Sequence, residues 1–291
     1  MSKPRSSRRP EWEGGAAPPL DRCVQVMRQA HGRDLSLFET TFLAQALQRR
    51  LTQTASTSWP AYLQRLAQDP AEGAAFWQSL SIAHSEFFRN PLTFALLEQL
   101  ILPSLVATKG ATDPTELRIW SAGCAAGQEA WSVAILLAEL AAARDGPVPC
   151  RIFATDVSEP ALALARRGDY DRAALQNVPL KHLQRYFVGQ GEAYALIPAL
   201  KSWVAFSTYD LLEERTACPP ASLYGDFDLI FCCNLLFYYR TDVRQRILDK
   251  VWKALAPGGY LVTGEVERDF VAKHEGLRAV APPAALFQKQ R

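Results

Sequence analysis

The spacing of the hydrophobic residues changes once along this chain of 291 residues, and the change limits the folds open to it. From Cys23 to about Leu102, apolar residues recur every three or four positions, which predicts amphipathic helices with ends near Pro60 and Pro70. Beyond the turn at 110–114, short apolar runs alternate with helical stretches, a pattern typical of βαβ units and a parallel sheet.

The pattern divides the chain into a disordered tail at 1–20, a helical N-terminal domain at 21–105 and an α/β domain at 106–291. Helices are expected after Gly127, at 159–167 and at 241–255, and the segment 186–201 fits a small hairpin. Five apolar runs are predicted as strands: RIWSAG (118–123), RIFATD (151–156), WVAFSTYD (203–210), FDLIFCCN (227–234) and YLVTGE (260–265).

Charge, hydropathy and cysteine spacing exclude several classes of function. Thirty-two Lys and Arg residues against thirty Asp and Glu leave a net charge of +2, which does not favour nucleic acid as a partner. The run at 131–143 is interrupted by Glu139 and is shorter than the ~18 residues of a spanning helix, so we expect no membrane insertion. The N-terminus has no apolar segment of a secretory signal, and the six cysteines form no CxxC pair. We therefore expect a cytoplasmic protein without a metal site.

Two strand ends carry residues suited to a nucleoside ligand. The first strand runs into the small-residue turn 121–129, which contains Gly123 and Gly127 and lets a ligand approach the backbone. The second strand ends at Asp156, whose carboxylate can accept hydrogen bonds from ribose hydroxyls. In the alternative interpretation the glycines serve a tight turn and Asp156 caps the helix after Ser158.

The turn also excludes two kinds of phosphate ligand. It lacks the G-x-G-x-x-G spacing of dinucleotide sites and the Gly-Lys-Ser/Thr of a P-loop. A ligand without phosphates, such as S-adenosylmethionine, fits better.

A series of motifs resembles the CheR-type protein-glutamate O-methyltransferases, which modify bacterial chemoreceptors. The motifs occur in the family's order from Cys23 to Phe287: SEFFRNP (85–91), RIWSAGCAAGQEAWS (118–132), FATDVSEPALALARRGDY (153–170), KHLQRYF (181–187), FSTYDLL (206–212), FDLIFCCNLLFYY (227–239) and LAPGGYLVTGEVE (255–267). The resemblance implies an α/β fold, namely a Rossmann-like class I methyltransferase domain with an N-terminal all-helical domain and a small inserted β-subdomain at 187–203.

The resemblance also implies a set of contacts to S-adenosylmethionine and to its product, S-adenosylhomocysteine. Three residues depart from the family's motifs, namely Ala83, Gln128 and Cys233. The cofactor set is Ser85, Arg89, Gly123, Glu129, Asp156, Asp210, Leu211, Cys233 and Asn234.

Methyl transfer to a glutamate side chain needs no general base, because a carboxylate with a pKa near ~4.3 is ionised at neutral pH. Catalysis then consists of alignment and exclusion of water. The resemblance places Arg89 and Tyr238 beside the reacting groups. In the alternative interpretation both residues are structural: Arg89 caps a helix that contains Phe87 and Phe88, and Tyr238 is a core aromatic. His84, which lies next to the FFR motif, is also interpreted as structural.

The acceptor implied by the family is the cytoplasmic helical domain of chemoreceptors, with its acidic faces. Arg49 and Arg50 follow an apolar helix stripe and could present positive charge to such a helix, or could belong to a solvated face. The segment 188–203 is short, so we expect no capture of a receptor C-terminal peptide.

Two alternatives to receptor methylation remain: a degenerate relative that binds cofactor or product as a regulatory module, and a methyltransferase for small molecules or RNA.

Overall fold

The structure is a computed structural model that describes residues 17–80, 85–112, 116–144, 146–222 and 225–290. Most of the predicted tail, as well as Ala83 and His84, lies outside the described residues. The chain divides into two compact units, Met1–Leu80 and Ser81–Arg291. The boundary differs from the expected one at 105/106, because Phe94 and Leu97 pack into the hydrophobic core of the second unit.

In its described part, 17–80, the first unit contains four helices, α1 (Leu20–His31), α2 (Thr40–Gln53), α3 (Trp59–Gln68) and α4 (Pro70–Ser79). Helix α3 begins after Ser58, whose hydroxyl accepts a hydrogen bond from the Ala61 N–H, and Asp69 accepts one from the Ala71 N–H at the start of α4. Pro60 and Pro70 both lie in first turns, where a missing N–H costs nothing. The largest fully buried side chains of this unit are Met27, Leu35, Leu47, Tyr62 and Phe76.

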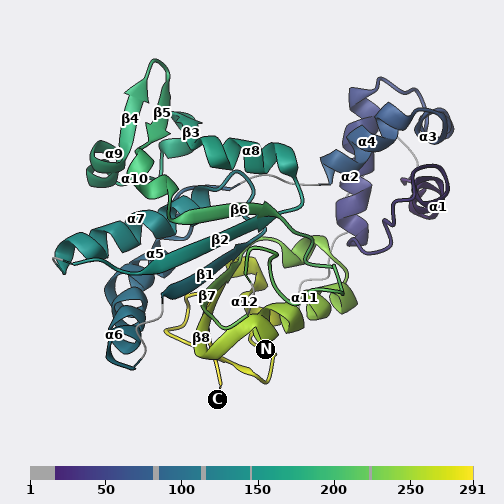
Figure 1. Cartoon of the computed structure of the whole chain (residues 1–291). Coiled ribbons are helices and arrows are strands. Elements are labelled where there is room, and N and C mark those ends of the chain that lie inside the picture. Colours follow the sequence, from purple (N-terminus) through teal and green to yellow (C-terminus); the bar gives the residue numbers. More distant parts are fainter. Residues whose placement is uncertain (1–16, 81–84, 113–115, 145, 223–224, 291) are drawn as a thin grey trace, which may run out of the picture. The chain divides into compact units, whose positions relative to one another are not determined.

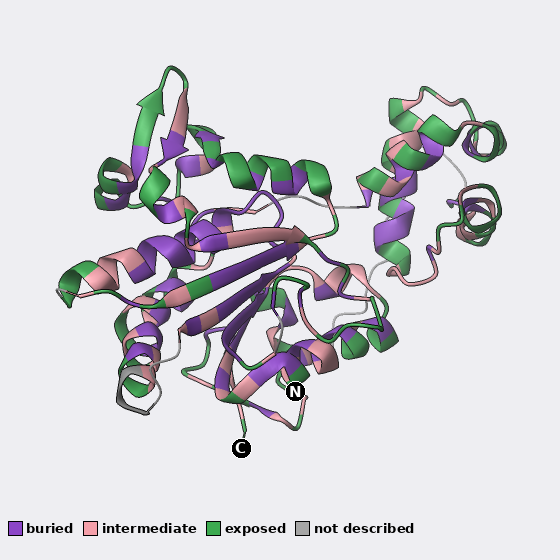
Figure 2. Cartoon of the chain, in the orientation of Figure 1, coloured by how far each residue is buried: buried purple, intermediate pink, exposed green. Residues whose placement is uncertain are grey.

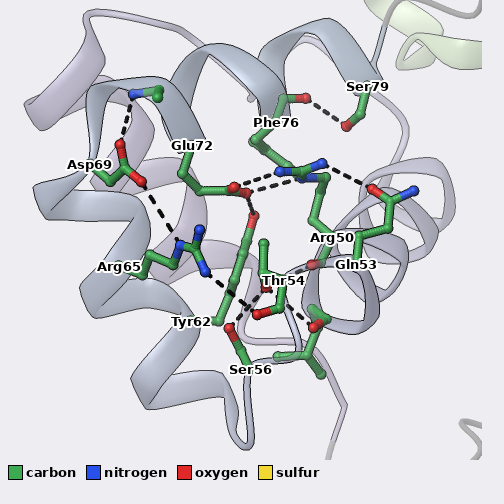
Figure 3. A network of polar contacts seen from close by, with 12 residues as sticks. Arg50, Gln53, Thr54, Ser56, Tyr62, Arg65, Asp69, Glu72, Phe76 and Ser79 are labelled. Atoms are coloured by element: carbon green, nitrogen blue, oxygen red, sulfur yellow. Dashed lines mark hydrogen bonds and ion pairs between the residues drawn. The ribbon is translucent and has the colours of Figure 1, made fainter.

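A buried polar network joins three helices of this unit (Figure 3). The guanidinium of Arg50 donates two hydrogen bonds to the carboxylate of Glu72, one of them from Nε at 3.0 Å. The Tyr62 hydroxyl donates to the same carboxylate at 2.9 Å. The Glu72 side chain is 3% exposed and that of Arg50 17%. Arg50 therefore belongs to an internal ion pair, which differs from the expectation that it presents free charge to a partner.

The second unit is built on a seven-stranded sheet with the order β6-β2-β1-β7-β8-β10-β9 (Figure 1). The five consecutive strands β6-β2-β1-β7-β8 are parallel, and the order reverses between β1 and β7, as in Rossmann-like folds. Strand β10 pairs antiparallel with both β8 and β9, an edge that the apolar runs did not predict. The strands are β1 (Leu117–Ala122), β2 (Cys150–Asp156), β6 (Val204–Thr208), β7 (Phe227–Cys232), β8 (Leu255–Thr263), β9 (Leu277–Ala279) and β10 (Leu286–Lys289).

Helices cover both faces of the sheet. Helices α7 (Gln128–Ala143) and α8 (Glu159–Arg167) lie on one face and α11 (Thr241–Ala254) on the other (Figure 1). Strand β7 is buried along its whole length, as Figure 2 shows, because both of its faces are covered. The predicted α/β fold is confirmed, and the five predicted strands and three predicted helices of this unit lie within a few residues of the observed ones.

A long helix precedes β1. It consists of α5 (Pro91–Leu96), a π-helical turn (Leu97–Ile101) and α6 (Leu102–Thr112). By length and composition alone, Pro91–Lys109 could cross a membrane, with a mean hydropathy of 1.4, whereas the sequence interpretation considered only 131–143. Core helices meet the same criterion, and here Ile101, Leu102 and Val106 join the hydrophobic core.

A small three-stranded antiparallel sheet, β3-β5-β4, is inserted before β6. The expected hairpin is present as β4 (Phe187–Gln190) and β5 (Ala193–Leu196), and β3 (Asp169–Asp171) adds a strand outside the predicted segment. The remaining elements are α9 (Leu180–Tyr186), α10 (Pro198–Lys201), α12 (Arg268–Val271) and the 3-10 turns η2 (Ala173–Leu175), η3 (Leu236–Tyr238) and η4 (Glu265–Glu267).

Candidate cofactor site

The turn between β1 and α7 requires glycine at Gly127. Its φ of +88° is left-handed, and a Cβ there would lie 2.8 Å from the Ala165 Cβ on α8. The tight-turn interpretation is thus correct for this glycine. Gly123 is also left-handed, at +78°, and lines a pocket at the end of the sheet.

Asp156 fastens this turn to the end of β2. Its Oδ2 accepts a hydrogen bond from the Ala125 N–H and its Oδ1 one from the Ser158 N–H, both at 2.9 Å. Helix α8 is capped by Ser158 itself, whose hydroxyl accepts from the Ala161 N–H. The Val157 N–H also acts on this carboxylate, and its four lone-pair sites still exceed the three backbone donors. Asp156 therefore has a structural role and retains acceptor capacity at the carboxyl edge of the sheet.

One pocket lies at the carboxyl ends of three adjacent strands, the position at which parallel sheets bind ligands. The segment 85–94 and the first turn of α7 complete its walls. Six of the predicted site residues line it together, namely Ser85, Arg89, Gly123, Glu129, Cys233 and Asn234. The other lining residues are Glu86, Asn90, Thr93, Phe94, Phe231, Val262, Thr263 and Gly264.

The segment that carries Arg89 is a turn anchored by two buried aromatic side chains. The Phe87 ring packs edge-on against Tyr170, with centroids 4.9 Å apart, and the Phe88 N–H donates to the Ser132 hydroxyl at 3.0 Å. Phe88 and Asn90 both have positive φ, at +48° and +73°, conformations that cluster at functional sites. No helix contains Phe87 and Phe88, so the helix-cap interpretation of Arg89 is wrong.

Glu129 is the acidic side of the pocket. Its Oε1 accepts a hydrogen bond from the Ser121 hydroxyl at 2.6 Å. Burial raises the pKa of the Glu129 carboxyl, opposed by hydrogen bonds from Ser121 and the Cys233 thiol and by the charge of Arg89. A desolvated carboxylate beside a pocket favours a cationic ligand group.

Sequence reasoning missed Glu267, which shapes the loop after β7. This carboxylate is 2% exposed and accepts backbone hydrogen bonds from Asn234 at 2.8 Å, Leu236 at 2.6 Å and Gly264 at 2.9 Å. Burial raises the pKa of Glu267, and these N–H donors oppose the shift. The signal in the sequence is an acid three residues after Gly264 in the last motif, but nothing local tells that it points inward.

Four of the predicted cofactor and catalytic residues do not line this pocket, namely Asp156, Asp210, Leu211 and Tyr238. Asp210 and Leu211 follow β6, the strand that pairs with β2. Desolvation raises the pKa of the half-buried Tyr239, and the charges of Asp210 and Asp156 add to the shift. The two carboxylates therefore lie near one another at the same edge of the sheet. Tyr238 is half-buried in η3 and packs against Phe237, with ring centroids 4.2 Å apart.

The structure describes the environment of two residues that depart from the family's motifs, Cys233 and Gln128. Burial and the neighbouring Glu129 raise the pKa of the Cys233 thiol well above its usual value, so it stays protonated. Gln128 is 8% exposed at the start of α7, and its Oε1 has no hydrogen-bond partner within the described parts of the chain.

The residues at this edge fit S-adenosylmethionine. Glu129 suits an ammonium group, Asp156 has free lone pairs for ribose hydroxyls, and a buried hydroxyl in the pocket wall, on Thr93, lacks a partner among the described residues.

Comparisons with known proteins agree with this geometry. The family described as "CheR methyltransferase, SAM binding domain" matches residues 83–280, which confirms S-adenosylmethionine as the cofactor. A "Chemotaxis protein methyltransferase 1" of Pseudomonas aeruginosa is 37% identical over 62% of this chain and 64% of its own length. The "Chemotaxis protein methyltransferase" of Escherichia coli K12 is 31% identical over 84% of this chain and 82% of its own length.

An uncharacterized 104.1 kDa protein of Rhodobacter capsulatus is 30% identical over 94% of this chain. This chain spans 29% of the length of that protein and less than two thirds of the Pseudomonas relative. The family match extends over more than half of the chain, and four of the seven motifs contribute residues to one pocket at the carboxyl edge of the sheet. The chain therefore belongs to the CheR methyltransferase family.

Proposed function

We propose that this protein transfers a methyl group from S-adenosylmethionine to glutamate side chains of bacterial chemoreceptors, forming glutamate methyl esters in chemosensory adaptation. The observation that carries the proposal is the placement of Arg89 and Glu129 in one pocket at the carboxyl ends of the strands. Relatives named chemotaxis protein methyltransferases support the choice of acceptor.

In the proposed reaction a carboxylate oxygen of the acceptor attacks the methyl carbon as the carbon–sulfur bond breaks. The cofactor, when bound, supplies the activated methyl group. The products are a methyl ester and a neutral thioether, and no proton moves, so the site needs no general base. The protein contributes alignment and a dry pocket. Arg89 is suited to orient the acceptor carboxylate because its planar guanidinium offers paired donors.

The other roles follow the positions of the side chains. We assign cofactor binding to Ser85, Arg89, Gly123, Glu129, Asp156, Asp210, Leu211, Cys233 and Asn234. Tyr238 remains a candidate for the second residue beside the reacting groups. Its position in η3, next to the loop of Asn234, supports that role.

The proposed acceptor is the cytoplasmic helical domain of a receptor, which makes this a cytoplasmic protein that neither inserts into the membrane nor binds nucleic acid. Arg49 is the better candidate for electrostatic docking, because it is exposed on α2 whereas Arg50 is paired with Glu72. The face around Arg49 is polar and includes Gln45, Gln48, Thr52 and Gln53.

The test is incubation of the purified protein with methyl-labelled cofactor and receptor-bearing membranes. Label recovered in a base-labile ester of the receptor supports the proposal. Arg89→Ala should lose most of the signal, whereas Lys273→Ala, an exposed substitution in the turn after α12, should keep it. Tight cofactor binding by the wild-type protein without any transfer would instead support a regulatory module, the alternative raised by the altered residues Ala83, Gln128 and Cys233.

A further inference from the structure

Thr93 lines the pocket and has a buried hydroxyl that lacks a partner among the described residues. The residue is the third in α5, is 0% exposed and belongs to the pocket wall. Its Oγ1 makes no hydrogen bond to any residue that the structure describes. Buried hydroxyls are almost always paired, and leaving one unpaired costs roughly 1–3 kcal/mol. An unpaired hydroxyl on a residue of a pocket wall indicates that a bound ligand supplies its hydrogen-bond partner.

The local backbone does not satisfy this hydroxyl. A helical threonine usually donates to the carbonyl of the residue four positions earlier, which here is Arg89. That bond is absent, although the first helical turn is otherwise intact, with the Phe94 N–H donating to the Asn90 carbonyl at 3.2 Å. The side chain is held in place because the next residue, Phe94, stacks on Phe231 of β7, with centroids 6.2 Å apart.

The charges on the pocket walls select the kind of ligand group. Arg89 lies four residues before Thr93 and lines the same pocket, so a residue with a guanidinium and one with a hydroxyl belong to one wall. Glu129 supplies the acidic side. A carboxylate accepts hydrogen bonds from both Arg and Thr, whereas an ammonium group is served by Glu129.

We propose that Thr93 donates a hydrogen bond to a ligand carboxylate that Arg89 also binds. Two carboxylates enter this pocket in the proposed reaction, the methionyl carboxylate of the cofactor and the acceptor glutamate. A contact to the acceptor glutamate rests on the proposed function, whereas a contact to the methionyl carboxylate rests only on cofactor binding. The cofactor's own carboxylate is accessible to measurement without any transfer.

The test uses Thr93→Val, which keeps the branched shape and removes the hydroxyl, and Thr93→Ser, which keeps the hydroxyl. In the ligand-free protein, Thr93→Val should leave the melting temperature unchanged or raised, because it removes an unpaired buried group. Titration calorimetry with S-adenosylmethionine should show a dissociation constant about 10- to 150-fold higher for valine and near wild type for serine. Thr108→Val, an exposed change on α6, is the matched control.

Decarboxylated S-adenosylmethionine distinguishes a contact to the cofactor carboxylate from a contact to the acceptor carboxylate. If the contact is to the cofactor, the valine variant and the wild type should bind this analogue equally. If the contact is to the acceptor, cofactor affinity should stay unchanged while the KM for receptor rises or kcat falls at least tenfold. Unchanged binding and unchanged transfer by Thr93→Val would overturn the inference, as would a penalty that persists with the decarboxylated analogue. Wild-type protein that binds cofactor but transfers nothing would remove the proposed function and leave the cofactor test standing.

Discussion

The backbone N–H of Asn234 donates to Oε2 of Glu267 at 2.8 Å, which links the loop after β7 to the end of β8 across 33 residues of chain. Asn234 has a left-handed φ of +56°, an uncommon conformation for a residue other than glycine. A Cβ at Gly264 would lie 2.7 Å from the Asn234 side-chain nitrogen, so the two loops pack without spare room. Glu267 thereby sets the position of a pocket residue without lining the pocket.

Glu267→Ala should destabilise the protein by about 3 kcal/mol, because three buried N–H donors lose a charged acceptor. Glu267→Gln should cost less and should still weaken cofactor binding, since one oxygen is replaced by a donor that faces N–H groups. Urea unfolding and calorimetry measure the two effects. Glu265→Gln, two residues earlier and exposed, is the control and should change neither quantity.

Substitution of Asp156 should weaken cofactor binding by about 10- to 150-fold, the equivalent of ~1.5–3 kcal/mol for hydrogen bonds to a charged group. Asp156→Ala should also lower stability, because the Ala125 and Ser158 N–H groups lose their acceptor. Asp156→Asn separates the effects, since it keeps one acceptor oxygen. A dissociation constant equal to wild type in both variants would remove Asp156 from the cofactor site, with Asp269→Ala as the exposed control.

Arg89→Ala should lower turnover far more than cofactor affinity if the guanidinium orients the acceptor carboxylate on the way to the transition state. Arg89→Lys should recover little, because lysine lacks the planar pair of donors. Steady-state kinetics with receptor measure turnover, and direct titration with cofactor measures affinity. Equal losses of turnover and of cofactor affinity would show that Arg89 contacts the cofactor alone. Tyr238 would then be the remaining candidate beside the acceptor carboxylate.

The two neighbouring arginines of α2 should behave differently. Arg50→Ala leaves Glu72 buried without its cation and should destabilise the first unit by about 3–5 kcal/mol. Arg49→Ala should leave stability unchanged, because Arg49 is exposed. Arg49→Glu should raise the KM for receptor with cofactor affinity intact. Receptor methylation unaffected by Arg49→Glu would exclude docking through this face.

Cofactor affinity should depend on pH through Glu129. Burial raises the pKa of this carboxyl, so it takes up a proton at a higher pH than an exposed glutamate does, above ~4.3. An ammonium group needs the ionised form, so affinity should be full near neutral pH and fall as the pH drops towards and through the raised value. Ser121, Cys233, Arg89 and Glu267 surround or influence the group and must stay unchanged in the comparison.

Calorimetry from pH 8 to pH 5 tests this dependence against the Glu129→Gln variant. The variant should bind more weakly at neutral pH and lose the component of the pH dependence that belongs to Glu129. Asp156 also has a raised pKa, so a residual slope in the variant is expected. Identical slopes in both proteins would show that Glu129 does not contact the cationic group.

The βαβ pattern was sufficient to predict the five parallel strands, because strands covered on both faces need apolar runs whatever their neighbours are. It did not predict β9 and β10, which are short and pair antiparallel at the edge. Helical spacing also misled at Phe87 and Phe88, which have the periodicity of a helix but lie in a turn. There, burial of the Phe87 ring against Tyr170 decides the conformation.

By itself, the sequence determined the α/β fold, the glycine turn after β1 and the ordered motifs that bring six site residues into one pocket. Only the tertiary structure decided how each charged or polar side chain is used. Arg49 and Arg50 are adjacent in sequence, yet one is exposed and the other is bound to Glu72, 22 residues away. Nothing local in the sequence tells that Glu267 and Thr93 are buried, because burial and pairing depend on residues brought together from distant parts of the chain.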